Sequence, residues 1–423
     1  MKNIAIVGMG YVGLPLALQF GRAGCRVVGL DIDPRKVEAL NTGQSYIRHV
    51  SAATIAEARA AGCLEASADF ARVRGVEAVI LCVPTPLNAY REPDLSYVLD
   101  TGRQIAPHLQ KGVLVVLEST TYPGTTDGEL RAVLEEGSGL KAGVDFHLAF
   151  SPEREDPGNP DSKVSIIPKV VGGYTPACLA KAQALYGLAI ERLVPVSSCG
   201  AAEATKLLEN IFRSVNIALV NELKVVYGAM GIDIWEVIEA AKTKPFGYMP
   251  FYPGPGLGGH CIPIDPFYLT WKAREFGQHT RFIELAGEIN TSMPLHVVRV
   301  AADALNEDAK AVKGSRILIL GLAYKANVDD DRESPSYKLI ERFEALGAQI
   351  EYHDPFVPVI PRTREHAAYA GRKSVPAITP DYDLIVLSTG HEVYRDFDFS
   401  QYPMPLVDTR NCVRVRPAKY FKA

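Results

Sequence analysis

Cysteine is sparse in this sequence, and no two cysteines have the spacing of a metal or redox motif. The 423 residues contain seven cysteines, which stand far apart at positions 25, 63, 82, 178, 199, 261 and 412. An odd, scattered set without a Cys-x-x-Cys pair predicts neither a disulfide framework nor a zinc site, so no bound metal is expected. Most of these cysteines are expected to be small buried apolar residues.

An excess of charge and long hydrophobic runs are also missing. The formal net charge is −4, from 45 basic and 49 acidic residues without a long run of either sign, so nucleic acid is not an expected partner. No stretch approaches the roughly 20 apolar residues that cross a bilayer. The first residues, MKNIAIVGMG, show no basic leader and no cleavage site. We therefore expect a cytoplasmic protein without a membrane segment.

What the sequence does have is an alternation of short apolar runs with helical stretches. The length of 423 residues predicts two or three domains. Strand-like runs lie at Asn3–Val7, Arg26–Leu30, Glu77–Val83, Val113–Leu117, Phe146–Phe150 and Arg192–Val196. This alternation is typical of a parallel sheet covered by helices. A second β-α-β pattern begins at Ser315, and because it lacks the full glycine fingerprint, no dinucleotide is expected there.

A long helix is predicted between the two alternating regions. Residues 201–229 contain no strand signal and place apolar residues at helical spacing. A helix of this length would span about 43 Å, which suits a connection between domains and between subunits. The predicted fold class is α/β, with two Rossmann-like doubly wound domains joined by a long central helix. The predicted boundaries are 1–198, 199–310 and 311–423.

A glycine motif directly after the first strand predicts a dinucleotide site. The run Gly8-Met-Gly10-Tyr11-Val12-Gly13 precedes a helix, and Asp31 closes the next strand. Glycines permit the tight turn and the close approach of a pyrophosphate, and the acidic residue accepts hydrogen bonds from a ribose. Since Asp31 would repel a 2′-phosphate, NAD is favoured over NADP. Lys36 leaves NADP open, because it is either a solvated lysine or a phosphate contact. The cofactor residues assigned here are Gly8, Gly10, Tyr11, Val12, Gly13, Asp31 and Lys36.

Three further polar residues follow apolar strands. Thr85 and Thr120 are placed to contact the cofactor, because ligands gather at the carboxyl ends of parallel strands. Their alternative role is to cap the next element. Glu153, in Ser-Pro-Glu after another strand, is placed to act as a general base, and its alternative is a solvated loop residue.

The central helix and the loop after it carry the remaining candidates. Lys206 and Asn210 are four residues apart, so they share a helix face, where a lysine and an amide can stabilise an oxyanion. A Gly/Pro-rich loop ends in Gly-Gly-His-Cys261, and Asp265-Pro266 then predicts a helix start. A cysteine near a helix N-terminus gains thiolate character. A Cys-His pair of the protease type is not favoured, because sequence neighbours rarely meet as nucleophile and base.

These motifs in this order closely resemble the UDP-glucose/GDP-mannose dehydrogenase family of nucleotide-sugar 6-dehydrogenases. The matching runs are GMGYVG, VPTPL, EST, SPE, the Lys-x3-Asn helix, GPGLGGHCIPIDP and YKANVDDDRES. The resemblance covers essentially the whole chain. It implies an NAD domain, a long-helix dimerisation region and a Rossmann-like domain that holds the nucleotide of a UDP-sugar. A homodimer or higher homo-oligomer is therefore expected.

The resemblance also implies a role for each matched residue. Cys261 resembles the nucleophile, and Lys206 and Asn210 resemble the pair that stabilises the oxyanion and contacts the sugar. Asp265 resembles a carboxylate that orients water or handles protons, and Glu153 resembles the general base. In the C-terminal region Lys325 resembles a substrate contact, Arg332 a cofactor contact and Arg410 a nucleotide contact. Candidates for substrate contact in the Gly/Pro-rich loop are Tyr252 and Gly258.

The chain departs from the family pattern at one informative position. Members that act on plain UDP-glucose carry a second glutamate four residues after the first, where this chain has Pro157. The stretches SPEREDPGNP and KPFGYMPFYPGPGLGGHCIPIDP most resemble members that act on UDP-N-acetyl-hexosamines for polysaccharide assembly. The predicted substrate is UDP-N-acetylglucosamine, and UDP-glucose, UDP-N-acetylmannosamine and UDP-N-acetylgalactosamine are the alternatives.

The predicted reaction is a four-electron oxidation of an alcohol to an acid with two NAD. Cys261 would trap the aldehyde as a thiohemiacetal, which is then oxidised to a thioester and hydrolysed. How Glu153 and Asp265 divide the proton transfers is left open. One rival is a two-electron hydroxyacid dehydrogenase, which would not need the cysteine. Another is a non-catalytic nucleotide-binding protein with the same fold.

Overall fold

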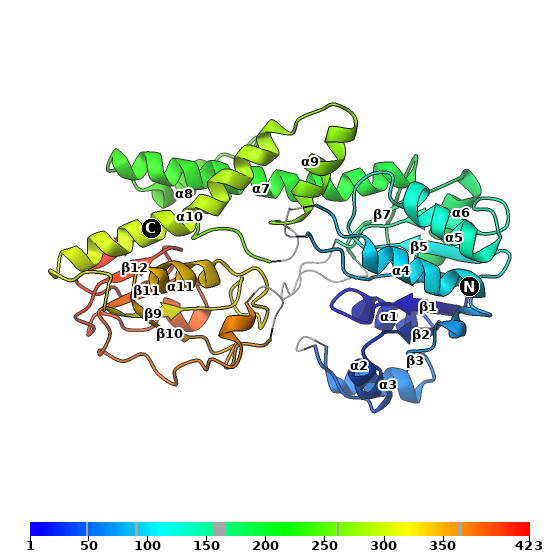
Figure 1. The fold of residues 1–423 in the computed structure, drawn as a ribbon, viewed down its shortest axis with the longest axis horizontal. Helices are drawn as coiled ribbons and strands as arrows, with labels where there is room; N and C mark the ends of the chain where they lie inside the picture. The colour runs from blue at the N-terminus through cyan, green and yellow to red at the C-terminus, as the bar shows by residue number, and fades with distance from the viewer. Residues whose placement is uncertain (48–49, 89–91, 155–165, 260–261, 363–365) are drawn as a thin grey trace. The chain divides into compact units, whose positions relative to one another are not determined.

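The chain folds into two compact units. The computed structural model describes residues 1–47, 50–88, 92–154, 166–259, 262–362 and 366–423 (Figure 1). Unit 1 comprises Met1–Glu209 and Phe267–His279, and unit 2 comprises Asn210–Pro266 and Thr280–Ala423. The three-part division at 1–198, 199–310 and 311–423 stays a prediction.

Unit 1 is built on an eight-stranded sheet with the order β3-β2-β1-β4-β5-β6-β7-β8. Neighbouring strands are parallel except β6 and β7, which run antiparallel. The strands are β1 Asn3–Val7, β2 Arg26–Leu30, β3 Leu64–Ser67, β4 Ala78–Leu81, β5 Leu114–Leu117, β6 His147–Phe150, β7 Lys169–Gly173 and β8 Leu193–Val196. The strand order reverses between β1 and β4, where doubly wound sheets bind ligands at the carboxyl ends of their strands.

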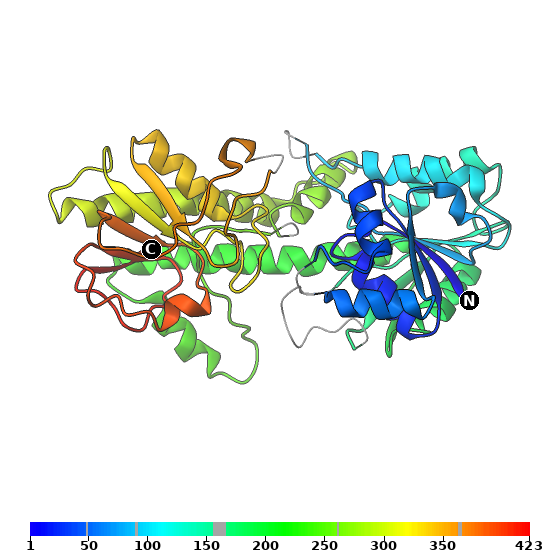
Figure 2. The same ribbon diagram turned by 90° about the horizontal axis from the view of Figure 1, so that it is seen from below.

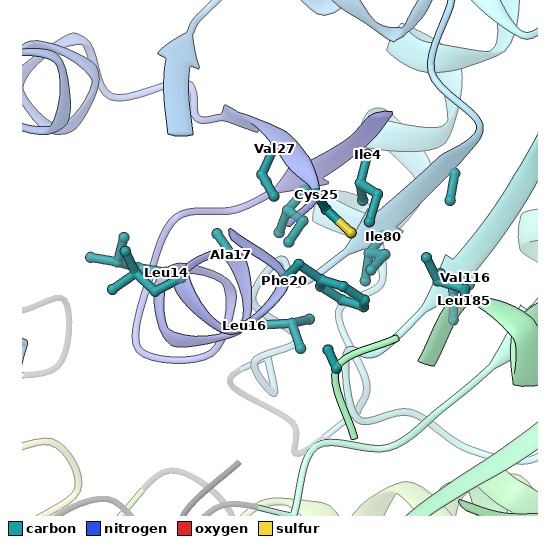
Figure 3. Close-up of a cluster of buried hydrophobic side chains, with 14 of the residues drawn as sticks. Ile4, Leu14, Leu16, Ala17, Phe20, Cys25, Val27, Ile80, Val116 and Leu185 are labelled. Atoms are coloured by element: carbon teal, nitrogen blue, oxygen red, sulfur yellow. The ribbon is translucent and has the colours of Figure 1, made fainter. Parts of the chain in front are cut away.

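Helices cover both faces of this sheet (Figure 2). Alternate β1 residues enter different cores: Ile4 and Ile6 pack with side chains of α1, α3 and α6, whereas Ala5 and Val7 pack with those of α4 and α5. Figure 3 shows the first core, in which Phe20 lies among the strand residues. The helices are α1 Gly13–Arg22, α2 Pro34–Asn41, α3 Ala52–Ala60, α4 Ser96–Ile105, α5 Arg131–Ser138 and α6 Pro176–Tyr186, with short helical turns η1 Phe70–Val73, η2 Ala106–His108 and η3 Thr126–Leu130.

The helix α7, Cys199–Ala229, is continuous over 31 residues, as the sequence predicts (Figure 1). It begins in unit 1 and continues into unit 2. The later helices are α8 Ile234–Lys242, α9 Asp265–Glu275, α10 Arg281–Asn306, α11 Pro335–Ala345 and α12 Glu392–Arg395, with the short turn η4 Ala367–Tyr369. No helix in the described ranges is both long and apolar enough to cross a membrane.

Unit 2 contains a five-stranded parallel sheet with the order β10-β9-β11-β12-β13. Its strands are β9 Arg316–Leu320, β10 Gln349–His353, β11 Leu384–Leu387, β12 Leu406–Asp408 and β13 Tyr420–Lys422. Helices α10 and α11 pack on one face, and a separate cluster that includes Tyr394 and Phe399 fills the other. The predicted α/β class with two Rossmann-like sheets is therefore confirmed.

Candidate active site

The glycine motif forms the turn between β1 and α1. Gly8 has φ +92°, and a Cβ there would lie 2.5 Å from the Cys82 carbonyl oxygen. A Cβ on Gly13 would collide with the Gly8 carbonyl, whereas a Cβ on Gly10 would meet nothing within 4 Å. Two glycines are therefore required by the fold itself, and the third leaves open space beside the backbone. This arrangement fits a pyrophosphate that approaches the helix N-terminus. Tyr11 and Val12, the other predicted contacts in this turn, are half-buried.

Asp31 lies buried at the carboxyl end of β2, next to this turn. Its carboxylate accepts hydrogen bonds from the backbone N–H groups of Met9 and Asp33, both at 2.9 Å. The Lys36 ammonium lies 3.1 Å from the same carboxylate. The two residues that made the choice between NAD and NADP ambiguous therefore form an ion pair. Because Lys36 is about one-third exposed, solvent weakens that pair.

We expect wild-type enzyme to prefer NAD over NADP by at least about 100-fold in kcat/KM, because a 2′-phosphate would face the fixed Asp31 carboxylate at a cost of several kcal/mol. Asp31→Asn should narrow that ratio, and Asp100→Asn, which changes an exposed carboxylate on α4, should not. Steady-state kinetics with both cofactors measures the ratio. Equal efficiency in the wild type would contradict the assignment and implicate Lys36.

Thr85 and Thr120 join the loops that follow β4 and β5. The buried Thr85 hydroxyl donates to the Thr120 carbonyl at 2.7 Å. The Tyr268 hydroxyl donates to the Thr85 carbonyl. The Thr85 side chain thus bridges two loops at the carboxyl edge of the sheet. A direct contact of either threonine with the cofactor stays a prediction.

Three basic side chains hold the Ser-Pro-Glu turn after β6. Lys206 of α7 donates to the carbonyl of Glu153, and Lys169 donates to the carbonyl of Pro152 at 3.4 Å. The third is Arg154, which donates to the Pro168 carbonyl at 2.6 Å. Unit 1 therefore brings two predicted catalytic residues together, the Lys206 ammonium and the half-buried Glu153.

A buried ion pair lies next to this turn, and the sequence analysis did not identify it. Lys169 lies 3.0 Å from the Glu118 carboxylate, which also accepts a hydrogen bond from the Tyr186 hydroxyl. The signal that was available is a lysine at the start of the apolar run KVVGG. An unpaired charge there would be costly, so a partner was required.

In unit 2, Asn210 and Asp265 are in direct contact. The Asn210 amide donates to the Asp265 carboxylate at 2.6 Å, and both side chains are buried. Asp265 is the first residue of α9, as the sequence predicts. The carboxylate is thus aimed at the amide of α7.

The Gly-rich loop packs against the segment after β9. A Cβ on Gly258 or Gly259 would lie 2.8 Å from atoms of Tyr324, the residue before Lys325. Gly259 also donates its N–H to the Arg332 carbonyl at 3.3 Å. Glycine is therefore required where the loop meets Tyr324, a residue that sequence reasoning missed. His260 and Cys261 lie outside the described residues, as does Pro157.

The remaining predicted contacts have other partners. Tyr252 is 42% exposed and donates its hydroxyl to Glu239 of α8 at 2.6 Å. The Arg332 guanidinium pairs with Asp330 at 2.7 Å. Arg410 follows β12 and donates from Nε to the Ser388 carbonyl at 3.0 Å. Their roles in binding stay predictions. Among the described residues, no cluster of three or more His, Cys, Asp or Glu side chains is placed to hold a metal ion.

Family models match nearly the whole chain. The NAD binding domain of the UDP-glucose/GDP-mannose dehydrogenase family matches residues 2–190. The central domain of that family matches 200–292, and its UDP binding domain matches 318–415. The order of these domains agrees with the positions of the glycine turn, of α7 and of the second sheet.

Individual relatives support the same assignment. The chain is 36% identical to UDP-N-acetyl-D-glucosamine 6-dehydrogenase of Pseudomonas aeruginosa, over 93% of this chain and 92% of the relative. It is 33% identical to NDP-N-acetyl-D-galactosaminuronic acid dehydrogenase of Ralstonia solanacearum, over 97% and 96%. The solved structure of UDP-D-ManNAc dehydrogenase from Pyrococcus horikoshii superposes with a TM-score of 0.90 at 31% identity, and covers 100% of this chain and 99% of that one. This chain therefore belongs to the UDP-glucose/GDP-mannose dehydrogenase family and is an NAD-dependent nucleotide-sugar dehydrogenase.

Proposed function

We propose that this enzyme oxidises the C6 alcohol of UDP-N-acetylglucosamine to the carboxylate, for polysaccharide biosynthesis. The observation that supports this chemistry is a pair of preformed hydrogen bonds. Lys206 donates to the Glu153 carbonyl, and Asn210 donates to the Asp265 carboxylate. Lys206 and Asn210 are four residues apart on the continuous helix α7, so they share a face of it. A buried cation and a buried amide can stabilise a sugar oxyanion.

The proposed chemistry has four stages. In the first, a carboxylate, Glu153 or Asp265, accepts the hydroxyl proton as C6 loses a hydride. The Cys261 thiolate then adds to the aldehyde and forms a C–S bond, and Lys206 with Asn210 stabilises the resulting oxyanion. A second hydride loss converts this thiohemiacetal to a thioester. Water finally breaks the C–S bond, which releases the acid and restores the thiol. Bound NAD supplies the hydride acceptor, and one molecule is consumed in each of the two oxidations.

The N-acetylglucosamine assignment rests on sequence likeness, including the Pseudomonas aeruginosa relative. The aromatic stretch before the Gly-rich loop does not form an enclosed apolar pocket within one chain, because Phe246 and Met249 are 71% and 62% exposed. An acetyl group adds one methyl, which is worth about 1–3 kcal/mol in an apolar pocket. We therefore expect a preference for UDP-N-acetylglucosamine, and UDP-glucose should still be oxidised slowly.

A panel of UDP-sugars tests both the reaction and the substrate. We expect two NADH per sugar consumed, and a kcat/KM for UDP-N-acetylglucosamine about 10- to 200-fold above that for UDP-glucose. UDP-N-acetylgalactosamine and UDP-N-acetylmannosamine complete the panel. One NADH per sugar would refute the four-electron reaction, whereas a lead for another sugar would refute only the substrate.

The exposed side of α7 supports a homodimer or higher homo-oligomer. Phe212, Leu219 and Val226 are spaced by seven residues and are 46%, 51% and 45% exposed. Apolar side chains at this spacing form a stripe that another helix can cover. We expect Leu219→Glu to dissociate the oligomer and Glu222→Gln, an exposed change on the same helix, to leave it intact. Light scattering measures the mass, and a monomeric wild type would contradict the proposal.

A cytoplasmic location is part of the proposal. The proposed nucleophile must stay a free thiol, and reducing compartments keep cysteines in that form. Cell fractionation followed by immunodetection tests it, and recovery of the enzyme outside the cytoplasm would contradict it.

A further inference from the structure

Within unit 2, α7 presents an unusual stripe of buried polar residues. Asn210, Ser214, Asn221 and Lys224 are all buried, and their spacing places them on one helix face. A buried polar group is costly unless it is hydrogen-bonded, and a buried charge needs more compensation than one neutral partner provides. Lys224, only 5% exposed, is therefore the residue in this stripe that most needs an explanation.

The partner of Lys224 is the backbone of the Gly/Pro-rich loop. Its ammonium donates to the Gly254 carbonyl at 3.2 Å. One turn earlier on the helix, Asn221 accepts a hydrogen bond from the Gly254 N–H at 3.0 Å. These two bonds fix Gly254 against α7. Among the described residues, the hydrogen-bond acceptor of the Lys224 ammonium is thus a neutral carbonyl.

A second cation, the half-buried Arg410, lies against the same glycine. A Cβ on Gly254 would lie 2.8 Å from Cζ of Arg410, so the guanidinium lies directly against this glycine. The carboxylate nearest to Arg410 along the chain, Asp408, is already engaged by the N–H groups of Arg410, Cys412 and Val413 and by a tyrosine hydroxyl. In the part of the chain that the structure describes, neither Lys224 nor Arg410 forms an ion pair with a carboxylate.

Another basic residue, His296 of α10, lies near Lys224 and is itself in contact with an arginine. His296 and Arg299 of α10 lie 3.0 Å apart through Nδ1 and Nη2. Burial, together with Lys224 and Arg299, lowers the pKa of His296 to about 4, so this imidazole is neutral near pH 7. The local arrangement is thus a buried lysine, a half-buried arginine, a neutral histidine and an exposed arginine.

We propose that Lys224 and Arg410 together bind a phosphate group of the nucleotide. This inference rests on the proposed function, because the phosphates are those of the UDP-sugar. The two residues lie in the segments matched by the family's central domain and UDP binding domain. An anionic phosphate accepts charge-assisted hydrogen bonds from both side chains and supplies the negative charge that the protein does not. Lys224 is then a binding residue in addition to the predicted Arg410.

Binding of a phosphate beside Lys224 should change the protonation of this lysine. Burial and the adjacent Arg410 lower the pKa of Lys224 to about 7 in the free protein. A bound phosphate favours the charged ammonium and raises that pKa. At pH 8 the free lysine is mostly neutral, and the terminal phosphate of UDP, with a pKa near 6, is already ionised. Binding of UDP at pH 8 should therefore take up to about one proton from the buffer.

Titration calorimetry at pH 8, in two buffers of different ionisation enthalpy, measures both affinity and proton uptake. We compare UDP with uridine for the full-length wild type, Lys224→Met and Lys224→Arg. We expect Lys224→Met to bind UDP at least about 10-fold more weakly, to bind uridine as the wild type does and to lose the proton uptake. Lys224→Arg should keep UDP affinity but lose the uptake, because arginine is always charged. Lys338→Met, which changes an exposed lysine of α11, is the control.

Three results would overturn the proposal: wild-type UDP binding without proton uptake, Lys224→Met with wild-type affinity for UDP, or equal losses for UDP and uridine. If Lys224→Met is too unstable to measure, the proton uptake when Lys224→Arg binds UDP is the deciding measurement. Proton uptake that persists in Lys224→Arg would refute the role of Lys224. The sugar panel is a separate test: an enzyme that binds UDP through Lys224 but does not oxidise UDP-N-acetylglucosamine would refute the proposed substrate alone.

Discussion

Cys261→Ser is expected to abolish net formation of the uronic acid, with a loss of at least about 10³-fold in turnover. A serine hydroxyl is a far weaker nucleophile than a thiolate near neutral pH, so the aldehyde is not captured and the second oxidation lacks its covalent substrate. Binding of NAD and of UDP should remain close to wild type, because neither requires the thiol. The measurement is steady-state acid formation together with the yield of NADH per sugar.

Cys63→Ser is the matched control for this variant. Cys63 is half-buried and lies in unit 1 between α3 and β3, away from the Gly-rich loop in sequence. Its replacement should leave turnover within about 3-fold of wild type, as expected for a change away from the reacting atoms. Normal acid formation by Cys261→Ser would end the covalent mechanism while leaving the family assignment intact.

Lys206→Met should lower kcat by about 10²- to 10³-fold, with a smaller change in KM. Removal of one preorganised donor to a developing oxyanion typically costs that much. Lys206 is buried on α7 and its ammonium already donates to the Glu153 carbonyl, so its position is set before substrate binds. Methionine keeps the length of the side chain and removes its charge.

The surface variant Lys141→Met controls for loss of a lysine in unit 1. Lys141 is 69% exposed and pairs with Glu135, and such exposed pairs contribute little to stability. Its kcat should match the wild type. A kcat of Lys206→Met within about 3-fold of wild type would show that the ammonium has only a structural role at the Ser-Pro-Glu turn.

The sequence by itself determined those parts of the protein in which the local backbone geometry allows only certain residue types. The turn after β1 needs Gly8 because a side chain would meet the Cys82 carbonyl, and this requirement is visible as a glycine motif. The helix α7 is visible because apolar spacing records a helical period. Asp265-Pro266 marks the start of α9 for the same kind of local reason.

Two strands show where local patterns stop being informative. β3, Leu64–Ser67, is a short edge strand with alternating burial, and β7, Lys169–Gly173, starts with a lysine and ends in two glycines. Neither is among the strand-like runs that the sequence predicts. Each is a strand because its backbone hydrogen bonds are completed by another segment of the chain. β3 pairs with β2, and β7 pairs with the antiparallel strand β6.

Only the tertiary structure decided which charged and polar groups meet. The ion pair of Lys36 with Asp31, the pair of Lys169 with Glu118, and the contact of Asn210 with Asp265 each join different elements. The approach of Lys224 and Arg410 to Gly254 brings three separate segments of the chain together. The type of a residue reflects the backbone conformation and the burial at its own position. The identity of its partner depends on how distant segments pack, and the sequence near either residue carries no trace of it.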